Sequence, residues 1–138
     1  MLVSCGQNAE KHYNEGRSWR EQDEPIAAMK SFIAATQSLS NNYAIKGRSY
    51  SNMATMCRIC ERHDLAYTIY EKSAEEFHRA KDTTAYAYAL NNMAWELAVQ
   101  GQKEQATALA DSACKVCPSN EVQNKTIETR AAACLYNA

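Results

Sequence analysis

The amino-acid sequence predicts an all-α protein in which three helix hairpins stack side by side, and three observations support that fold class. Helix breakers are scarce, with 4 glycines and 2 prolines in 138 residues, while alanine, the best helix former, is abundant. One pattern of small and large residues occurs three times along the chain. A single hairpin cannot bury its own apolar face, so the three copies are expected to pack against one another.

Each copy of the pattern pairs two small residues that lie 12 positions apart. A small residue in each helix lets two antiparallel helices approach closely, while larger residues three or four positions away fill the space beside them. An asparagine precedes the first small residue by two positions in every copy. The small pairs are Gly16 and Ala28, Ala54 and Ala66, and Ala94 and Ala106, and the asparagines are Asn14, Asn52 and Asn92.

Short turns divide each copy into two helices, with the sequences QDEP, ERHD and QGQK. Pro25 suits the first turn of a helix, where its missing N–H costs nothing. Gly101 suits the residue that follows a helix. Three hairpins are therefore expected over about 9–42, 47–80 and 87–120, preceded by a tail over 1–8. Residues 121–138 predict a seventh helix, which either caps the third hairpin or begins a fourth repeat.

The repeated pattern resembles that of the tetratricopeptide repeat family. Residues 87–118, which include LNNMAWEL and ATALADSACKVCP, match that pattern best. The resemblance implies a right-handed α-solenoid and a non-catalytic scaffold that binds a peptide or protein in a concave groove. The first small residues lie 38 and 40 residues apart, against about 34 in the family, and we expect the extra residues to lengthen the helices.

Repeats of this long period are similar to those of bacterial regulators and sensor proteins. The alternative function is therefore a sensor or regulatory segment of a larger, lipid-anchored bacterial protein.

The same resemblance implies which side chains of the first helices face the groove. Arginines there would favour an acidic or carboxylate-bearing partner, and asparagine amides can hold a peptide backbone. The alternatives are that the asparagines bond between neighbouring helices, that the arginines form a solvated face, and that the tryptophan packs against the next repeat. The expected groove residues are Tyr13, Arg17, Arg20, Arg48, Ser51, Asn52, Thr55, Arg58, Tyr88, Asn91, Asn92 and Trp95.

The composition argues against several other classes of function. The formal net charge is −1, and the 22% of charged residues are of both signs and interspersed, which gives no basic patch for nucleic acid. Motifs for hydrolytic, phosphate-binding or metal-dependent catalysis are absent from the sequence. We expect no enzyme activity and no cofactor, and His63-Asp64 is interpreted as an exposed turn at a helix start.

Two C-x-x-C pairs, CRIC (57–60) and CKVC (114–117), raise the question of a metal or redox site. The repeat pattern places both pairs in helices, whereas zinc knuckles place such pairs on a tight turn. We therefore interpret these cysteines as packing positions, since a buried cysteine behaves as a small hydrophobe. No metal is expected, and the alternative is metal or redox use of the thiols.

The first residues, Leu2-Val3-Ser4-Cys5 before Gly6, match a bacterial lipobox, in which the cysteine is lipidated. The charged and apolar segments of a signal peptide are not present before them. As given, the chain is expected to be cytoplasmic, without a membrane span. The alternative is a cell-envelope lipoprotein anchored at Cys5, if a signal peptide precedes Leu2. A further alternative is association of the chain with itself through exposed terminal helices.

Overall fold

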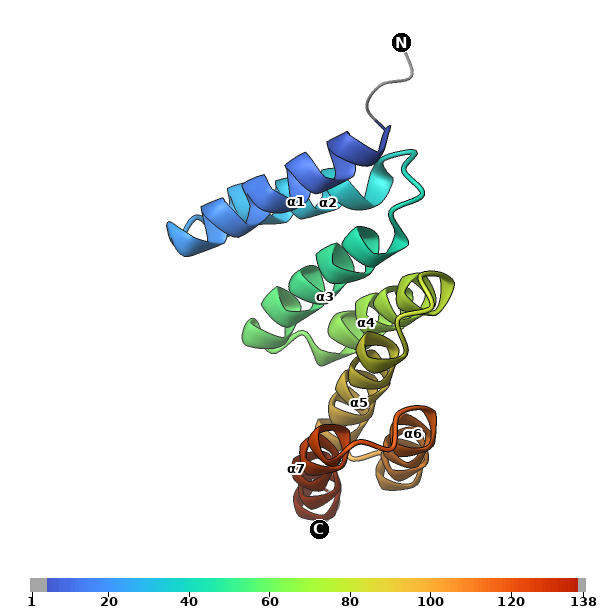
Figure 1. Ribbon diagram of the computed structural model, residues 1–138. Helices are drawn as coiled ribbons and strands as arrows, with labels where there is room; N and C mark the ends of the chain where they lie inside the picture. Colours follow the sequence, from blue (N-terminus) through green and yellow to red (C-terminus); the bar gives the residue numbers. More distant parts are fainter. Residues whose placement is uncertain (1–4, 137–138) are drawn as a thin grey trace.

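The computed structural model describes the backbone of residues 5–136 and the side chains of residues 8–136. Seven α-helices and no strand occupy that range, so the predicted all-α solenoid is confirmed. Figure 1 shows the helices stacked in chain order, with the two ends of the chain at opposite ends of the stack. The helices are α1 (Cys5–Glu21), α2 (Pro25–Gln37), α3 (Tyr43–Ile59), α4 (His63–Arg79), α5 (Thr83–Val99), α6 (Lys103–Val116) and α7 (Asn120–Tyr136).

The first six helices form three hairpins, α1–α2, α3–α4 and α5–α6, with turns at the predicted places. One residue with positive φ reverses the chain in each hairpin turn. These residues are Asp23 (φ 59°), Glu61 (φ 59°) and Gly101 (φ 81°). Glycine reaches this left-handed region without steric cost, whereas Asp and Glu there cost about 1 kcal/mol. Only the third turn therefore uses the residue type that suits its backbone best.

Tight contact between a small residue and a ring holds each of the first two hairpins together. A Cβ added to Gly16 would lie 2.6 Å from the Phe32 ring, and one added to Gly47 would lie 2.8 Å from the Phe77 ring. The small residues of the second helices, which include Ala28, are fully buried. Close approach of the backbones thus depends on small residues, both those of the repeated pattern, such as Gly16 and Ala28, and Gly47 outside it.

The residues that lengthen the repeats are mostly helical, as expected. They extend the starts of α3 and α5, which are both 17 residues long. The connection between α2 and α3 is an exception, because residues 38–42 are not helical. The predicted tail over 1–8 is wrong in its last part, since α1 begins at Cys5 and no proline interrupts the helix there. Residues Leu2 to Ser4 of the lipobox match, and the side chain of Cys5, lie outside the described residues.

The seventh helix, α7, packs against both α5 and α6 and covers one side of the third hairpin. Its start is capped by Ser119, whose Oγ accepts a hydrogen bond from the Val122 N–H at 3.2 Å. Val122, Thr126 and Thr129 are buried against the hairpin. The predicted seventh helix is therefore present in the position that the sequence suggested.

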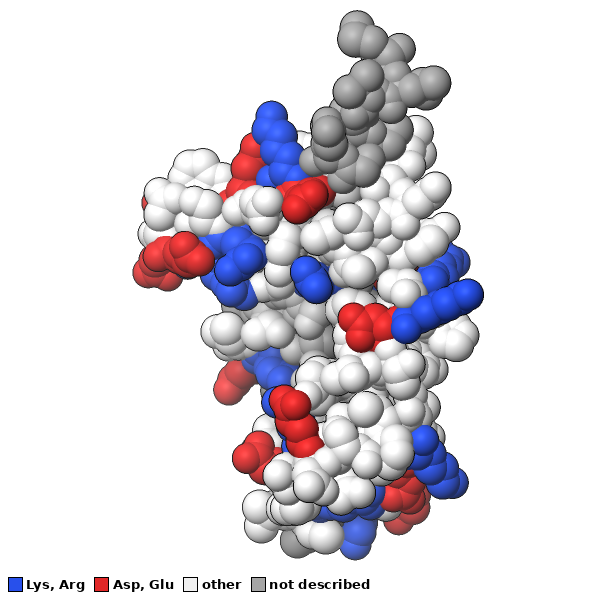
Figure 2. All heavy atoms as spheres, in the orientation of Figure 1, with Lys and Arg blue, Asp and Glu red and all other residues white. Residues whose placement is uncertain are grey.

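Charged side chains of both signs are interspersed over the face of the molecule shown in Figure 2. None of the helices among the described residues combines the length and apolar character of a membrane span.

Candidate functional site

A groove of about 500 Å³ lies between the first helices α3 and α5 and the seventh helix α7. Six of the twelve expected groove residues line it, all of them on α3 and α5. They are Ser51, Arg58, Tyr88, Asn91, Asn92 and Trp95. Apolar side chains of α4 and α5 also line it, namely Phe77, Ala85 and Ala89. The repeats therefore bring one half of the expected set together around a single hollow.

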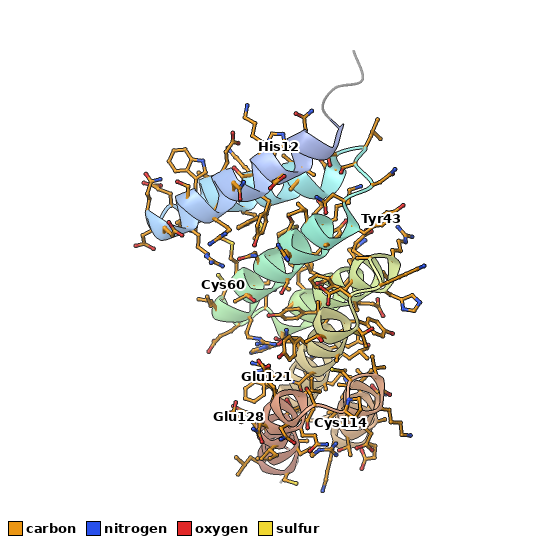
Figure 3. The ribbon with its side chains drawn as sticks, in the orientation of Figure 1. His12, Tyr43, Cys60, Cys114, Glu121 and Glu128 are labelled. Atoms are coloured by element: carbon orange, nitrogen blue, oxygen red, sulfur yellow. The ribbon has the colours of Figure 1, made fainter. Side chains whose placement is uncertain are left out.

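The remaining wall of the groove comes from α7, which sequence reasoning did not assign to it. Glu121, Lys125, Glu128 and Thr129 line this side, and Figure 3 shows Glu121 and Glu128 on the same side of α7. Lys125 Nζ lies 5.1 Å from the centre of the Tyr88 ring, a cation–π contact across the groove wall. The groove thus carries carboxylates as well as cations.

Two polar contacts attach α7 to α5 at this wall. The buried Thr129 hydroxyl donates to Asn91 Oδ1 at 2.8 Å. A hydrogen bond to Glu121, helped by partial burial, raises the pKa of Tyr88 to about 12. The Asn91 side chain is 8% exposed and holds the two helices together. Asn92 and Trp95, which are half-buried, remain more open to a partner.

A buried ion cluster lies beside the groove and centres on Glu96 of α5, whose side chain is 0% exposed. Arg58 Nε of α3 donates a short hydrogen bond to Glu96 Oε1. His63 Nδ1, at the start of α4, lies 2.7 Å from Glu96 Oε2. The Arg58 guanidinium also stacks over the rings of Tyr70, at 4.9 Å, and Trp95, at 6.0 Å. The cluster therefore ties the second hairpin to the third.

This cluster corrects the interpretation of His63-Asp64 as an exposed turn. Asp64 is exposed, and a backbone hydrogen bond at the helix start lowers its pKa. His63, in contrast, is only half-exposed and pairs with a buried carboxylate on another hairpin. Sequence reasoning missed Glu96, because a single glutamate in a helix is usually solvated.

An arginine and an asparagine link successive first helices in the same way twice. Arg20 of α1 donates a short hydrogen bond to Asn52 Oδ1 of α3. Arg58 of α3 donates to the Asn92 carbonyl at 3.3 Å and to its Oδ1 at 3.5 Å. Each arginine stands four positions after a small residue of the pattern, and each asparagine stands two before the next one. For these two asparagines, the interpretation as contacts between neighbouring helices is confirmed.

The remaining expected groove residues lie away from this groove. Arg20, Asn52 and Thr55 line a second hollow of about 340 Å³, between the α1–α2 turn and the end of α3. The Thr55 hydroxyl also shares a hydrogen bond with Tyr70 Oη, at 2.7 Å. Tyr13, Arg17 and Arg48 line neither hollow. Arg17 lies 5.9 Å above the Tyr13 ring, and Arg48 is exposed.

The two C-x-x-C pairs lie on separate hairpins and do not form one site. Figure 3 shows Cys60 and Cys114 well apart, at the end of α3 and on α6. Cys57 is buried, as the repeat pattern predicts, and burial together with the neighbouring Cys60 raises its pKa. Among the residues that the structure describes, no group of three or more His, Cys, Asp or Glu side chains is arranged to hold a metal ion.

Comparisons with known proteins agree on the fold. A family model described as tetratricopeptide repeat matches residues 46–119, which is more than half of the chain. The solved N-terminal domain of stress-induced protein-1 (STI-1) from C. elegans is similar, with a TM-score of 0.77 and 16% sequence identity. That likeness covers 91% of this chain and 97% of the other, and at this identity it shows the fold alone. A search of curated proteins finds no match.

Proposed function

This chain belongs to the tetratricopeptide repeat family, and on that premise we propose that it is a scaffold that binds a peptide segment of a partner protein in the groove between α3, α5 and α7. The observation that carries the proposal is the convergence of aromatic, amide and charged side chains from three helices around one hollow. Such a mixture gives an interface both contact area and directional hydrogen bonds.

Tyr88, Asn92 and Trp95 are the residues that we assign to partner contact. Tyr88 and Trp95 are half-buried rings that line the groove, which is the character of anchor residues at interfaces. Asn92 uses its oxygens to accept from Arg58. Its amide N–H groups are oriented by that contact, and we assign them to a backbone carbonyl of the peptide.

The charge of the groove favours a partner segment of mixed charge. Arg58 is the one expected arginine that lines the groove, and its charge is already balanced by buried Glu96. Lys125 supplies a second cation, while Glu121 and Glu128 supply two carboxylates. The acidic preference expected from the arginines is thereby reduced, because a strongly acidic peptide would meet these carboxylates.

A capture experiment with matched variants tests the groove. The chain is immobilised, and partners captured from an extract of the source cells are compared with those captured by Y88A and Lys125→Glu variants. Tyr86 lies on the same helix but packs against the tilted ring of His78, with the ring centres 5.2 Å apart, outside the groove, so Tyr86→Ala is the control for Tyr88. Lys115→Glu on α6 is the control for the charge change.

We expect the groove variants to lose the specific partners and the control variants to keep them, with all four variants folded by circular dichroism. Partners that survive both groove substitutions would place binding elsewhere on the molecule. An Arg58 variant is unsuitable for this purpose, because removal of Arg58 would leave Glu96 buried without its main partner.

A further inference from the structure

The outer face of α7 carries a stripe of exposed apolar residues, Ile127, Ala131, Cys134 and Leu135, named here the α7 stripe. Ile127 is 61% exposed and Leu135 is 75% exposed, and the other two are also exposed. Their spacing of three and four residues places all of them on one side of the helix. None of them lines the groove. A helix that only capped the solenoid would present polar residues on its outer face.

The α7 stripe repeats a face of α5 that is covered in the structure. Each of its residues lies 37 positions after its counterpart on α5. The counterparts are Leu90, Ala94, Leu97 and Ala98, which are 7%, 0%, 7% and 0% exposed. Leu97 and Ala98 share an apolar cluster with Ala106 of α6 and with Ala132 and Ala133 on the inner side of α7. The same kind of face is therefore buried by neighbouring helices on α5, with α6 among them, and is bare on α7.

The helix that covers this face has the same character in all three hairpins. It carries a small residue at a position i, an aromatic residue or an alanine at i+4, and a small residue again at i+7. These residues are Ala28, Phe32 and Ala35 in α2, Ala66, Tyr70 and Ser73 in α4, and Ala106, Ala110 and Ala113 in α6, all of them 0% or 1% exposed. Small residues on one helix of a hairpin thus receive larger ones on the other, as Gly16 of α1 receives the Phe32 ring of α2.

We propose that the α7 stripe binds an amphipathic helix of a partner protein, antiparallel to α7, with small residues at positions i and i+7 and an alanine or aromatic residue at i+4. The bound helix stands to α7 as α6 stands to α5, and it buries Ile127 and Leu135. Figure 1 shows α7 at the end of the stack, beside α5 and α6, so a further helix extends an interface that the chain already builds.

A second copy of the chain does not fit the stripe as well. The small faces of α2, α4 and α6 are buried within their own hairpins. The remaining arrangement, α7 against α7 about Ala131, would oppose Ile127 to Leu135. Large residues would then meet large ones, and the size complementarity seen in each hairpin would be lost.

A labelled synthetic peptide of residues 100–118, which contains α6, is the probe. It is titrated into the full chain and into two variants, Ala131→Glu in the stripe and Ala108→Glu on the exposed outer face of α6. We expect saturable binding with a gain of helicity in the peptide, since so short a helix is marginal alone. A carboxylate in the contact would weaken binding by at least about tenfold in Ala131→Glu, while the Ala108→Glu variant binds as the unchanged chain does.

A second peptide, with glutamate at the Ala110 position, controls for the small face of the probe and is expected not to bind. The absence of saturable binding to the unchanged chain would overturn the proposal, as would equal binding to the two Ala→Glu variants. Light scattering of the chain without peptide supplies the other outcome. If the unchanged chain is a dimer and Ala131→Glu makes it a monomer, the stripe binds a second copy of the chain, and the proposal is likewise overturned.

Discussion

Replacement of Arg58 by methionine is the sharpest perturbation of the link between the second and third hairpins. Glu96 is 0% exposed, and Arg58 and His63 are the two side chains that contact its carboxylate, with side chains 27% and 31% exposed. Removal of one partner from a buried ion pair costs roughly 3–5 kcal/mol. Because water reaches the partly exposed partners, we place the loss near the lower end, at about 3 kcal/mol.

Loss of the Arg58 stacking on Tyr70 and Trp95 adds about 0.5–1 kcal/mol to this figure. For a chain of this length the sum corresponds to a fall of roughly 10 °C in melting temperature. Urea and thermal unfolding are followed by circular dichroism and tryptophan fluorescence, whose transitions must coincide for a two-state free energy. Arg48→Met, at an exposed arginine on the same helix, is the control and should stay within about 0.5 kcal/mol of the unchanged chain.

The double variant that combines Arg58→Met with Glu96→Leu tests the cause of this loss. If the single loss comes from a stranded carboxylate, removal of that carboxylate restores most of the stability. A single Arg58→Met variant that loses less than about 1 kcal/mol would refute the assignment of Glu96 as a buried charge that depends on Arg58. A double variant as unstable as the single one would show that packing, and not the ion pair, is the cause.

Three further predictions concern packing, titration and thiol reactivity. Gly16→Ala destabilises by about 1–3 kcal/mol in urea unfolding, because its Cβ meets the Phe32 ring at 2.6 Å; a gain of about 1 kcal/mol, as helix propensity alone predicts, would contradict this. Tyr88 keeps its proton in the folded chain to about pH 12, against 10.0 for a free tyrosine. The hydrogen bond from Tyr88 to Glu121 therefore stabilises the fold below pH 10 and is lost as the pH rises through about 12. Ultraviolet difference titration checks this, because the Tyr88→Phe variant should lack the late ionisation step of the unchanged chain. Burial raises the pKa of Cys57, so timed alkylation read by mass spectrometry labels exposed Cys60 well before Cys57; equal rates would argue against a packing role.

The hairpins could be read from the sequence because their determinants are local. The spacing of 12 residues between Gly16 and Ala28, and its repetition further along the chain, reflects two helices joined by a short turn. The burial of Cys57 follows from the same pattern. Six groove residues on α3 and α5 were accessible for that reason too, since a helix face is set by the positions along one helix.

The contacts between hairpins could not be read in this way. Glu96 resembles any solvated glutamate in a helix, and its partners Arg58 and His63 stand 38 and 33 positions away. Asn91 was expected in the groove and lines it, but Thr129 already holds its oxygen. These pairs depend on the rotation and tilt of one hairpin against the next, which no local pattern specifies.

By itself, the sequence determined the helical class, the three hairpins, their turns and the small residues that let each pair of helices approach. Only the tertiary structure decided that α7 closes one wall of the groove while its outer face, with Ile127 and Leu135, stays bare. The physical reason is range. Turns and helix faces follow from residues a few positions apart, whereas a groove wall and a free face arise only when distant helices have been placed against one another.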